Sequence, residues 1–189
     1  MSTLELIAFV LGVINVTLVV RRSVWNYPFG LVMVVLYGRL FFDAKLYSDA
    51  LLQVFFFVVQ LYGWWAWSRV SANAGTVLID RLGARARLGW AVGCAAAIIV
   101  WSSLVSHYTD ASLPWWDASA AILSVAAQIM MSRRLIENWV LWIMVDILSI
   151  GLYAAKGLWL TMLLYAVFLA LAIWGLIGWQ HDARQQAAA

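Results

Sequence analysis

Residues 133–179 read RRLIENWVLWIMVDILSIGLYAAKGLWLTMLLYAVFLALAIWGLIGW and decide the fold. They form two apolar stretches joined by a short turn at Lys156-Gly157. Each stretch is long enough to cross a membrane as a helix, which takes about 17 to 25 apolar residues. In the first stretch the polar and aromatic side chains recur every three or four positions, so they share one face of the predicted helix. That face holds Trp139, Trp142, Asp146, Ser149 and Tyr153, and Asn138 stands just before them.

An ionisable side chain, Asp146, lies in the middle of this predicted span. A carboxylate in the membrane interior is costly, so it normally faces the inside of a helix bundle or a wet cavity and marks a pathway. The indole of Trp142 lies one turn away on the same face. We therefore interpret this face as a substrate site. Two structural alternatives stay open: a carboxyl group that hydrogen-bonds between helices for packing, and tryptophans that only anchor helices at the membrane surface.

The composition places the chain in the membrane. Of its 189 residues, 66% are hydrophobic and only 11% are charged, whereas a soluble domain is about 25% charged. The single cysteine, Cys94, excludes an internal disulfide and a soft-metal cluster. The basic residues are scattered over short turns and form no patch, which argues against a nucleic-acid partner. We expect a protein of the lipid bilayer with no metal, no cofactor and no catalytic residues.

Seven segments are apolar and long enough to span a bilayer. They are residues 3–20, 27–44, 48–68, 88–107, 115–132, 138–155 and 157–179. Basic residues favour cytoplasmic loops, and those that would share one side are Arg21, Arg22, Arg69, Arg81, Arg85, Arg87, Arg133, Arg134 and Arg184. The sequence thus predicts an outer N-terminus and an inner C-terminus. We expect the longest inner loop, residues 68–89, to be a solvated connector at the lipid surface.

The chain contains an internal repeat. A shift of 112 residues superimposes Arg21-Arg22 on Arg133-Arg134 and Asn26 on Asn138. The same shift matches Gly63 with Gly175 and Trp67 with Trp179, together with six Leu and Phe pairs between residues 36 and 56. Spans one to three therefore repeat as spans five to seven. Because three is odd, the fourth span is needed to restore the direction of the second copy.

This pattern predicts an all-α integral membrane protein of seven transmembrane helices with a 3-1-3 parallel repeat. Its parts are a first three-helix repeat (1–68), an inner loop and linker helix (69–110), a second three-helix repeat (111–180) and a cytoplasmic tail (181–189). The pseudo-twofold axis would run along the membrane normal. Transporters built from repeats hold their substrate at the repeat interface near the midplane.

Facing stripes on other spans supply further candidate ligands. Helical spacing places Asp117, Ser124 and Gln128 on one face of the fifth span. Similar spacing places Gln53, Gln60, Trp64 and Trp67 on one face of the third span. It also places Thr161 and Tyr165 on one face of the seventh span. Asn15 of the first span and Asn26 before the second add two more amides. From these stripes we select Gln53, Asp117, Gln128 and Tyr165 as binding candidates. Hydrogen bonds between helices are an equally good explanation of each amide.

Tryptophans near the ends of the spans have a different expected role. Trp25, Trp67, Trp115 and Trp179 are predicted to belong to the aromatic belts at the membrane surfaces.

The residue types indicate the kind of solute. Indole faces stack on flat rings and attract cations, with a contribution of about 0.5 to 2 kcal/mol. Asp146 could balance a positively charged ring, and the amides could hydrogen-bond hydroxyl groups. Apart from Arg39, no cationic side chain is placed within a span to receive a phosphate. The predicted solute is therefore flat, hydroxylated and neutral or cationic, and a nucleotide fits poorly.

Several motifs resemble the PnuC family of bacterial vitamin transporters, above all its nicotinamide riboside members. The most specific are Trp25-Asn26-Tyr27-Pro28-Phe29-Gly30, Leu46-Tyr47, Leu51-Leu52-Gln53-Val54-Phe55, Tyr62-Gly63-Trp64, Trp116-Asp117, Ser124, Arg133-Arg134, Glu137-Asn138-Trp139, Trp142, Asp146, Tyr153 and Gly157. The resemblance implies a SWEET-like 3-1-3 fold in the bacterial cytoplasmic membrane. It also implies uptake of nicotinamide riboside by facilitated diffusion, with trapping by a cytosolic kinase. The family signature maps to Asn138, Trp139, Trp142 and Asp146, to which it assigns substrate binding.

Other functions stay open at this stage. A thiamine uniporter of the same fold would use the same residues, because thiamine also carries a cationic ring. A proton-coupled symporter would use Asp146 as the proton carrier. A retinal photoreceptor is disfavoured, since it needs a lysine inside the last span and the chain has only Lys45 and Lys156, at outer turns. An inert scaffold or a receptor is a further alternative, and a homo-oligomer, with a trimer as the candidate, is left open.

Overall fold

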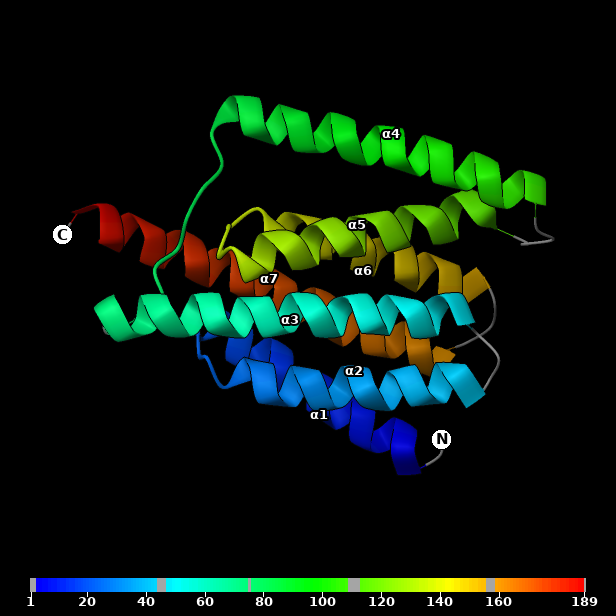
Figure 1. Ribbon diagram of the computed structural model, residues 1–189, viewed down its shortest axis with the longest axis horizontal. Helices are drawn as coiled ribbons and strands as arrows, with labels where there is room; N and C mark the ends of the chain where they lie inside the picture. The colour runs from blue at the N-terminus through cyan, green and yellow to red at the C-terminus, as the bar shows by residue number, and fades with distance from the viewer. Residues whose placement is uncertain (1–2, 44–46, 75, 109–112, 156–158, 189) are drawn as a thin grey trace.

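The computed structural model describes the chain except for residues 1–2, 44–46, 75, 109–112, 156–158 and 189 (Figure 1). The described residues form seven α-helices and no strands. The helices are α1 (Thr3–Val20), α2 (Asn26–Asp43), α3 (Tyr47–Ala74), α4 (Ala84–Tyr108), α5 (Pro114–Ser132), α6 (Asn138–Ala155) and α7 (Trp159–Ala188). The prediction of an all-α protein with seven long helices is confirmed. The turn predicted at Lys156-Gly157 lies outside the described residues.

Two helices are longer than the predicted spans. Helix α3 continues to Ala74 and α7 to Ala188, with 28 and 30 residues. At 1.5 Å per residue each is more than about 40 Å long, which exceeds the roughly 30 Å hydrocarbon layer. Their C-terminal turns therefore project beyond the apolar layer, on the side of the molecule where the C-terminus lies (Figure 1).

The helices pack as two triplets and one peripheral helix. In the first triplet α2 packs against α1 and α3, and in the second α6 packs against α5 and α7. The triplets meet through two contacts, α1 with α7 and α3 with α5. Among the described helices α4 packs only against α5, and it lies at the edge of the bundle (Figure 1).

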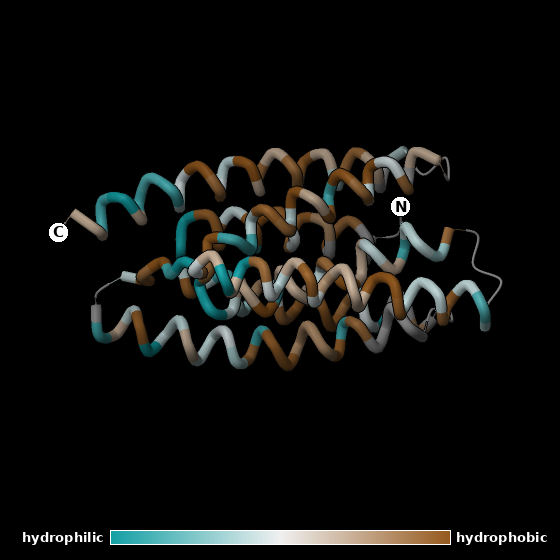
Figure 2. The backbone as a smooth tube through the Cα atoms, turned by 90° about the horizontal axis from the view of Figure 1, so that it is seen from above, coloured by the Kyte–Doolittle hydropathy of each residue, from teal (hydrophilic) through white to brown (hydrophobic). Residues whose placement is uncertain are grey.

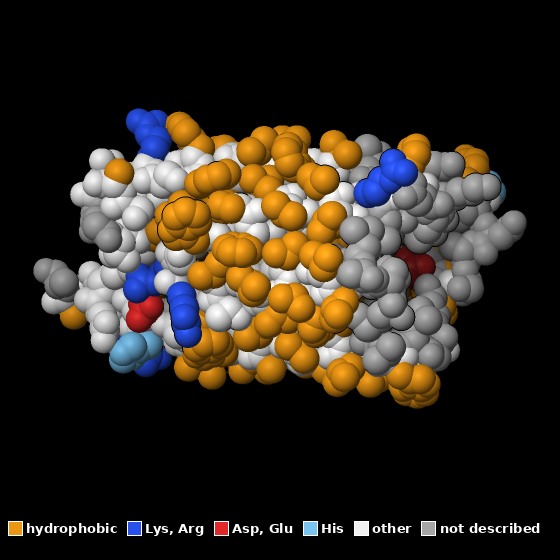
Figure 3. All heavy atoms as spheres, turned by 90° about the horizontal axis from the view of Figure 1, so that it is seen from below, with side chains coloured by type: hydrophobic (Ala, Val, Ile, Leu, Met, Phe, Trp, Pro, Cys, Tyr) orange, Lys and Arg blue, Asp and Glu red, His pale blue; other side chains and the backbone are white. Residues whose placement is uncertain are grey.

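The surface between the two ends of the bundle is apolar. Large hydrophobic side chains are exposed on every helix, hydrophobic residues dominate the middle of the bundle (Figure 2), and charged groups lie toward its ends (Figure 3). Among the described residues, Ala84–Tyr108 and Met162–Ala188 have the length and hydropathy to cross a membrane, and Phe9–Val20 and Asn138–Leu152 are shorter apolar helices. This is the surface expected of helices that lie in lipid.

The turns after α1 and α5 have the same unusual geometry. Arg22 and Arg134 adopt positive φ angles of 54° and 61°, which are uncommon for residues other than glycine. In the first turn the Ser23 N–H donates to the Leu18 carbonyl and the Arg22 N–H to the Val19 carbonyl. The second turn repeats both bonds 112 positions later. This is the Schellman arrangement that ends a helix and satisfies its last carbonyls.

The following helices begin alike as well. Asn26 Nδ2 donates to the Ser23 carbonyl at 2.7 Å, and Asn138 Nδ2 donates to the Leu135 carbonyl at 2.7 Å. Both turns, the C-termini of α3 and α7 and the N-terminus of α4 lie at one end of the bundle. We call it the arginine end, because the nine arginines that the sequence places on one side lie in these segments and in the loop between α3 and α4.

The loop between α3 and α4 differs from its prediction. Much of the expected loop is helical, and the remaining segment is not solvated throughout, because Val77 and Ile79 are buried. Asp80 pairs with the backbone of the α5–α6 turn, since its N–H donates to the Arg134 carbonyl and its carbonyl accepts from Ile136 N–H, each at 3.0 Å. The prediction of a solvated connector is therefore wrong. Alternating apolar residues in an extended segment point to one face, and here that face packs onto the bundle.

Candidate functional site

The polar face of α6 points into the bundle. Asn138, Trp139, Asp146 and Ser149 are all buried, with at most 4% of each residue exposed. Trp142 is partly buried and packs against the core cluster at the arginine end. The inward direction predicted for this face is confirmed for these residues. The side chain of Tyr153 lies outside the described residues.

Asp146 is the ionisable group at the centre of this face. Only 3% of it is exposed, and it forms no ion pair with any described residue. A buried carboxylate without a cationic partner is costly, so a bound cation would be favourable there. Asp146 lies eight residues from Asn138, which places it about 12 Å along α6 from the arginine end. It is therefore well inside the bundle.

Trp139 is largely occupied by packing. Its ring lies against Gly175 of α7, where a Cβ atom would come within 2.6 Å of the indole. It also makes an edge-to-face contact with Trp179, with ring centroids 5.5 Å apart. Its Nε1 atom is buried and has no hydrogen-bond partner within the described structure. Trp139 thus has a structural role, and its free N–H is the group that could still bind a solute.

The four tryptophans predicted to form the aromatic belts divide into two pairs. Trp25 and Trp115 are 71% and 51% exposed, as expected of belt residues. Trp67 and Trp179 are fully buried, so for them the prediction is wrong. Their helices continue beyond the apolar layer, and both rings turn inward to the contact between the triplets. Proximity to a span's end in the sequence does not reveal this inward direction.

The amides Asn15 and Gln60 form a buried polar cluster in the first triplet around Gly30 of α2. A Cβ atom on Gly30 would clash with Gln60 Oε1 and would lie 2.7 Å from Asn15 Nδ2. Asn15 Nδ2 donates a 2.7 Å hydrogen bond to the Asn26 carbonyl. Sequence reasoning noted both amides but not Gly30 as the residue that makes room for them. The internal repeat contains a signal for this role: a shift of 112 residues aligns Gly30 with the much larger Trp142, which indicates that the space beside Gly30 is filled by other side chains.

The remaining candidates lie at different places around the bundle. Gln128 of α5 is 5% exposed, and its Nε2 atom has no partner in the described part of the chain. Gln53 lies against Gly38 of α2, because a Cβ atom added at Gly38 would be 3.5 Å from the Cβ atom of Gln53. Asp117 is in the first turn of α5, roughly 16 Å along the helix from Gln128. Tyr165 of α7 is half-buried and makes an edge contact with Phe168 at 6.0 Å.

Trp116 was not selected from the sequence, yet it holds α5 and α6 together beside this face. Its Nε1 atom donates a 2.7 Å hydrogen bond to the Leu148 carbonyl. Its ring lies over Gly151, where a Cβ atom would come within 2.7 Å of it. Trp116 thus positions the part of α6 that follows Asp146.

A groove of about 510 Å³ lies elsewhere, between α4 and α5. It is lined by small and apolar residues that include Gly89, Gly93 and Ala126. None of the predicted binding residues contributes to it.

These features together define a class of protein. The helix bundle has an apolar surface, and it buries a carboxyl group and several amides and partly buries the indole of Trp142. Intramembrane groups of this kind mark solute pathways, and repeat-built transporters hold their solute between such helix sets. The chain has the architecture of a membrane transporter.

Comparison with known proteins specifies the family. Residues 2–181 match the family described as nicotinamide mononucleotide transporter, and the chain belongs to this family. It is 29% identical to the nicotinamide riboside transporter PnuC of Escherichia coli, over 100% of this chain and 89% of that protein. It is 31% identical to the PnuC of Neisseria mucosa (94% and 72%). It is also 29% identical to the riboflavin/roseoflavin transporter RibM of Streptomyces davaonensis (97% and 87%).

A solved structure has the same fold. The crystal structure of the vitamin B3 transporter PnuC superimposes with a TM-score of 0.80 at 29% identity, over 97% of this chain and 83% of that one. The resemblance inferred from the motifs is therefore confirmed.

Proposed function

We propose that this chain imports nicotinamide riboside across the cytoplasmic membrane by facilitated diffusion. The observation that carries the proposal is the buried carboxyl group of Asp146, which forms no ion pair with any described residue, with Trp142 on the same inward face of α6. The nicotinamide ring of the riboside is flat and cationic, so both groups suit it. Net accumulation would follow from phosphorylation inside the cell, because none of the candidate site residues is cationic and the phosphate of the product would have no partner there.

The proposed fold is a 3-1-3 parallel repeat of the SWEET type. The matched turns at Arg22 and Arg134 support it, and so do two equivalent sets of ring contacts. Tyr27 contacts Trp67 edge-to-face with centroids 5.5 Å apart, and Trp139 contacts Trp179 at 5.5 Å. The peripheral attachment of α4 suits a linker helix. With the arginine end in the cytoplasm, the N-terminus would be outside and the C-terminus inside.

Each candidate residue has a proposed role in binding. Trp142 would stack on the nicotinamide ring and Asp146 would balance its charge. Asn138 and Gln128 would orient the amide and ribose through Oδ1 and Nε2, buried atoms without partners in the described structure. Trp139 would wall the site and donate its free indole N–H. Gln53, Asp117, Tyr153 and Tyr165 are weaker candidates that would act from the periphery.

Counterflow in proteoliposomes tests the function. Labelled nicotinamide riboside should exchange against an excess of unlabelled riboside inside the vesicles, and thiamine, riboflavin and nicotinamide mononucleotide should not replace it. Riboside should also raise the melting temperature of the purified protein, whereas the mononucleotide should not. Exchange of thiamine with no exchange of riboside would replace this proposal by the thiamine uniporter.

Proton-coupled symport is the second candidate, and it is favoured by the same buried carboxyl group, which has no ion-pair partner among the described residues. In that case an imposed pH gradient would drive riboside uptake, and Asp146→Asn would abolish the response. Uptake that ignores the gradient supports the uniporter.

A further inference from the structure

Two buried tryptophans join the triplets at the arginine end. Trp67 of α3 and Trp179 of α7 are 0% exposed, and their ring centroids lie 5.9 Å apart. Each ring also packs edge-to-face on an aromatic residue of its own triplet, Trp67 on Tyr27 and Trp179 on Trp139. Four aromatic rings therefore fill the space between the triplets at this end of the bundle.

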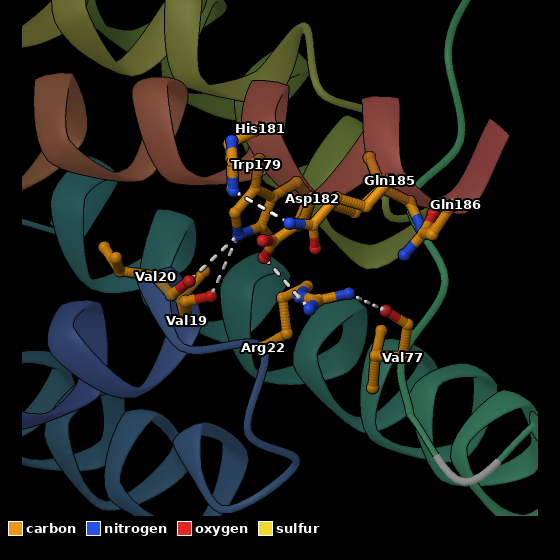
Figure 4. A network of polar contacts seen from close by, with 10 residues as sticks. Val19, Val20, Arg22, Val77, Trp179, His181, Asp182, Gln185 and Gln186 are labelled. Atoms are coloured by element: carbon orange, nitrogen blue, oxygen red, sulfur yellow. Dashed lines mark hydrogen bonds and ion pairs between the residues drawn. The ribbon is translucent and has the colours of Figure 1, made fainter. Parts of the chain in front are cut away.

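The indole N–H groups of this pair cross from one triplet to the other. Trp67 Nε1 donates to the Met131 carbonyl of α5 at 3.1 Å. Trp179 Nε1 donates to the Val19 and Val20 carbonyls of α1 at 3.3 and 3.2 Å (Figure 4). Val19 and Met131 are 112 positions apart, as are the two tryptophans, so the bonds are reciprocal. Their acceptors lie in the last turns of α1 and α5, and the Val19 and Met131 carbonyls also accept the Arg22 and Arg134 N–H groups of the turns that end these helices.

A third link between the triplets lies beside Trp179. Arg22, which follows α1, forms a 2.9 Å ion pair with Asp182 of α7, and it donates to the Val77 carbonyl at 3.1 Å (Figure 4). The Arg22 and Asp182 side chains are 19% and 29% exposed. Water can therefore reach this link from the end of the bundle.

The links between the triplets differ in kind from the contacts within them. Inside the triplets, Tyr27 lies against Gly63 and Trp139 against Gly175, so close that a Cβ atom on the glycine would come within 2.6 Å of the Tyr27 hydroxyl or of the Trp139 ring. Such packing holds each triplet as one body. The crossing bonds use helix-end carbonyls and a partly exposed ion pair, whose groups water can satisfy once the ends separate. These links are therefore reversible.

We propose that Trp67, Trp179 and the Arg22–Asp182 ion pair form a gate at the arginine end, and that this structure has that gate closed. Opening exchanges the two crossing indole bonds and the ion pair for hydration while each triplet keeps its internal packing. The gate rests on the proposed transport function but is independent of which solute is carried.

Accessibility of a buried cysteine tests the gate without a substrate. Ser149→Cys, in a Cys94→Ala background, places a thiol on the inward face of α6 at a residue only 4% exposed. The measurement is its modification rate by a membrane-impermeant cationic methanethiosulfonate, in membrane vesicles of both orientations. Arg133→Cys, an exposed position at the arginine end, identifies the orientation that presents this end to the reagent.

The test variant is Trp67→Phe with Trp179→Phe, which removes both N–H donors and keeps aromatic rings. One hydrogen bond corresponds to roughly a five-fold change in an equilibrium constant, so the rate from the arginine end should rise at least about ten-fold. Trp65→Phe with Trp174→Phe is the matched control, because these tryptophans lie on the same two helices and are 55% and 47% exposed. The control should leave the rate unchanged.

An unchanged rate in the double variant, at a normal melting temperature, would overturn the gate. Should that variant fail to insert, Asp182→Asn is the deciding variant, because it weakens only the partly exposed ion pair. A rise of about two-fold or more is expected there, and no rise would reject the proposal. If the labelling rates change as expected but riboside counterflow fails, nicotinamide riboside is rejected as the substrate and the proposed gate still stands.

Discussion

The two triplets have the same turns and aromatic contacts but different residues at their centres. In α1–α3, Asn15 and Gln60 surround Gly30. At the positions 112 residues later, α5–α7 have Ala127, Trp142 and Ala172. Two amides next to a glycine in the first triplet thus correspond to two alanines and an indole in the second. Val34 likewise corresponds to Asp146, and both are buried.

In the proposed repeat, this difference would allow two similar triplets to bind an unsymmetrical solute. The parts that repeat lie at the arginine end, where both triplets need the same turns and the same link to each other. The parts that differ lie deeper, where one triplet offers amides and the other an aromatic ring and a charge. A riboside has the same division, since its ring is flat and cationic and its sugar is polar.

The largest expected effect is on the shared frame. Gly175→Ala would bring a Cβ within 2.6 Å of the rigid Trp139 ring, and overpacking of this kind costs about 1–3 kcal/mol. Gly63→Ala should cost a similar amount through Tyr27. Thermal melting in detergent measures both. Gly178→Ala is the control, because nothing lies within 4 Å of its added Cβ, and a control equally destabilised would show that the clash is not the cause.

Substitution of the indole that distinguishes the second triplet should have the next largest effect. Trp142→Ala removes the stacking and cation–π contribution of up to about 2 kcal/mol, so riboside counterflow should fall about 30-fold. Trp174→Ala, an exposed tryptophan on α7, should transport normally. Retention of full activity by Trp142→Ala, with normal insertion, would exclude this indole from the site.

Loss of the charge that distinguishes Asp146 from Val34 should weaken binding by less. Asp146→Asn preserves the shape of the side chain and removes its charge, so affinity for the cationic riboside should fall about ten-fold, equivalent to roughly 1.4 kcal/mol. An uncharged reduced riboside should bind the variant and the parent protein alike. Binding can be followed by titration calorimetry, and equal losses for both ligands would contradict a countercharge role.

The smallest effect is expected in the first triplet. In Gly30→Ala the added Cβ meets the end of the flexible Gln60 side chain, so the loss of stability should be about 1 kcal/mol, at the low end for overpacking. The double variant Gly30→Ala with Gln60→Ala should recover part of that loss, because the shorter side chain makes room for the added Cβ. Alanine is also the residue at position 172, which corresponds to position 60 in the second triplet. A double-mutant cycle measures this coupling, and strict additivity would show that the two positions do not share the space.

Sequence reasoning succeeded where periodicity and residue chemistry are local. The helices follow from long apolar runs, and the inward face of α6 follows from the spacing of Trp139, Trp142 and Asp146. It failed for Trp67 and Trp179, because a tryptophan near the end of a span fits a membrane belt and an internal contact equally well. It also failed for residues 76–80, which were predicted to be solvated. The burial of Val77 and Ile79 depends on the surface of the bundle that they cover, and that surface is formed by residues far away in the sequence.

The sequence by itself determined the membrane class, the seven helices, the repeated Arg-Arg turns and the family, because each is encoded in hydropathy, spacing or a short motif. Only the tertiary structure decided that two indoles cross between the triplets and that Gly30 makes room for amides where its counterpart is Trp142. Such pairings join residues far apart in the chain, and they depend on which helix faces meet and how closely. No local pattern in the sequence specifies that distance.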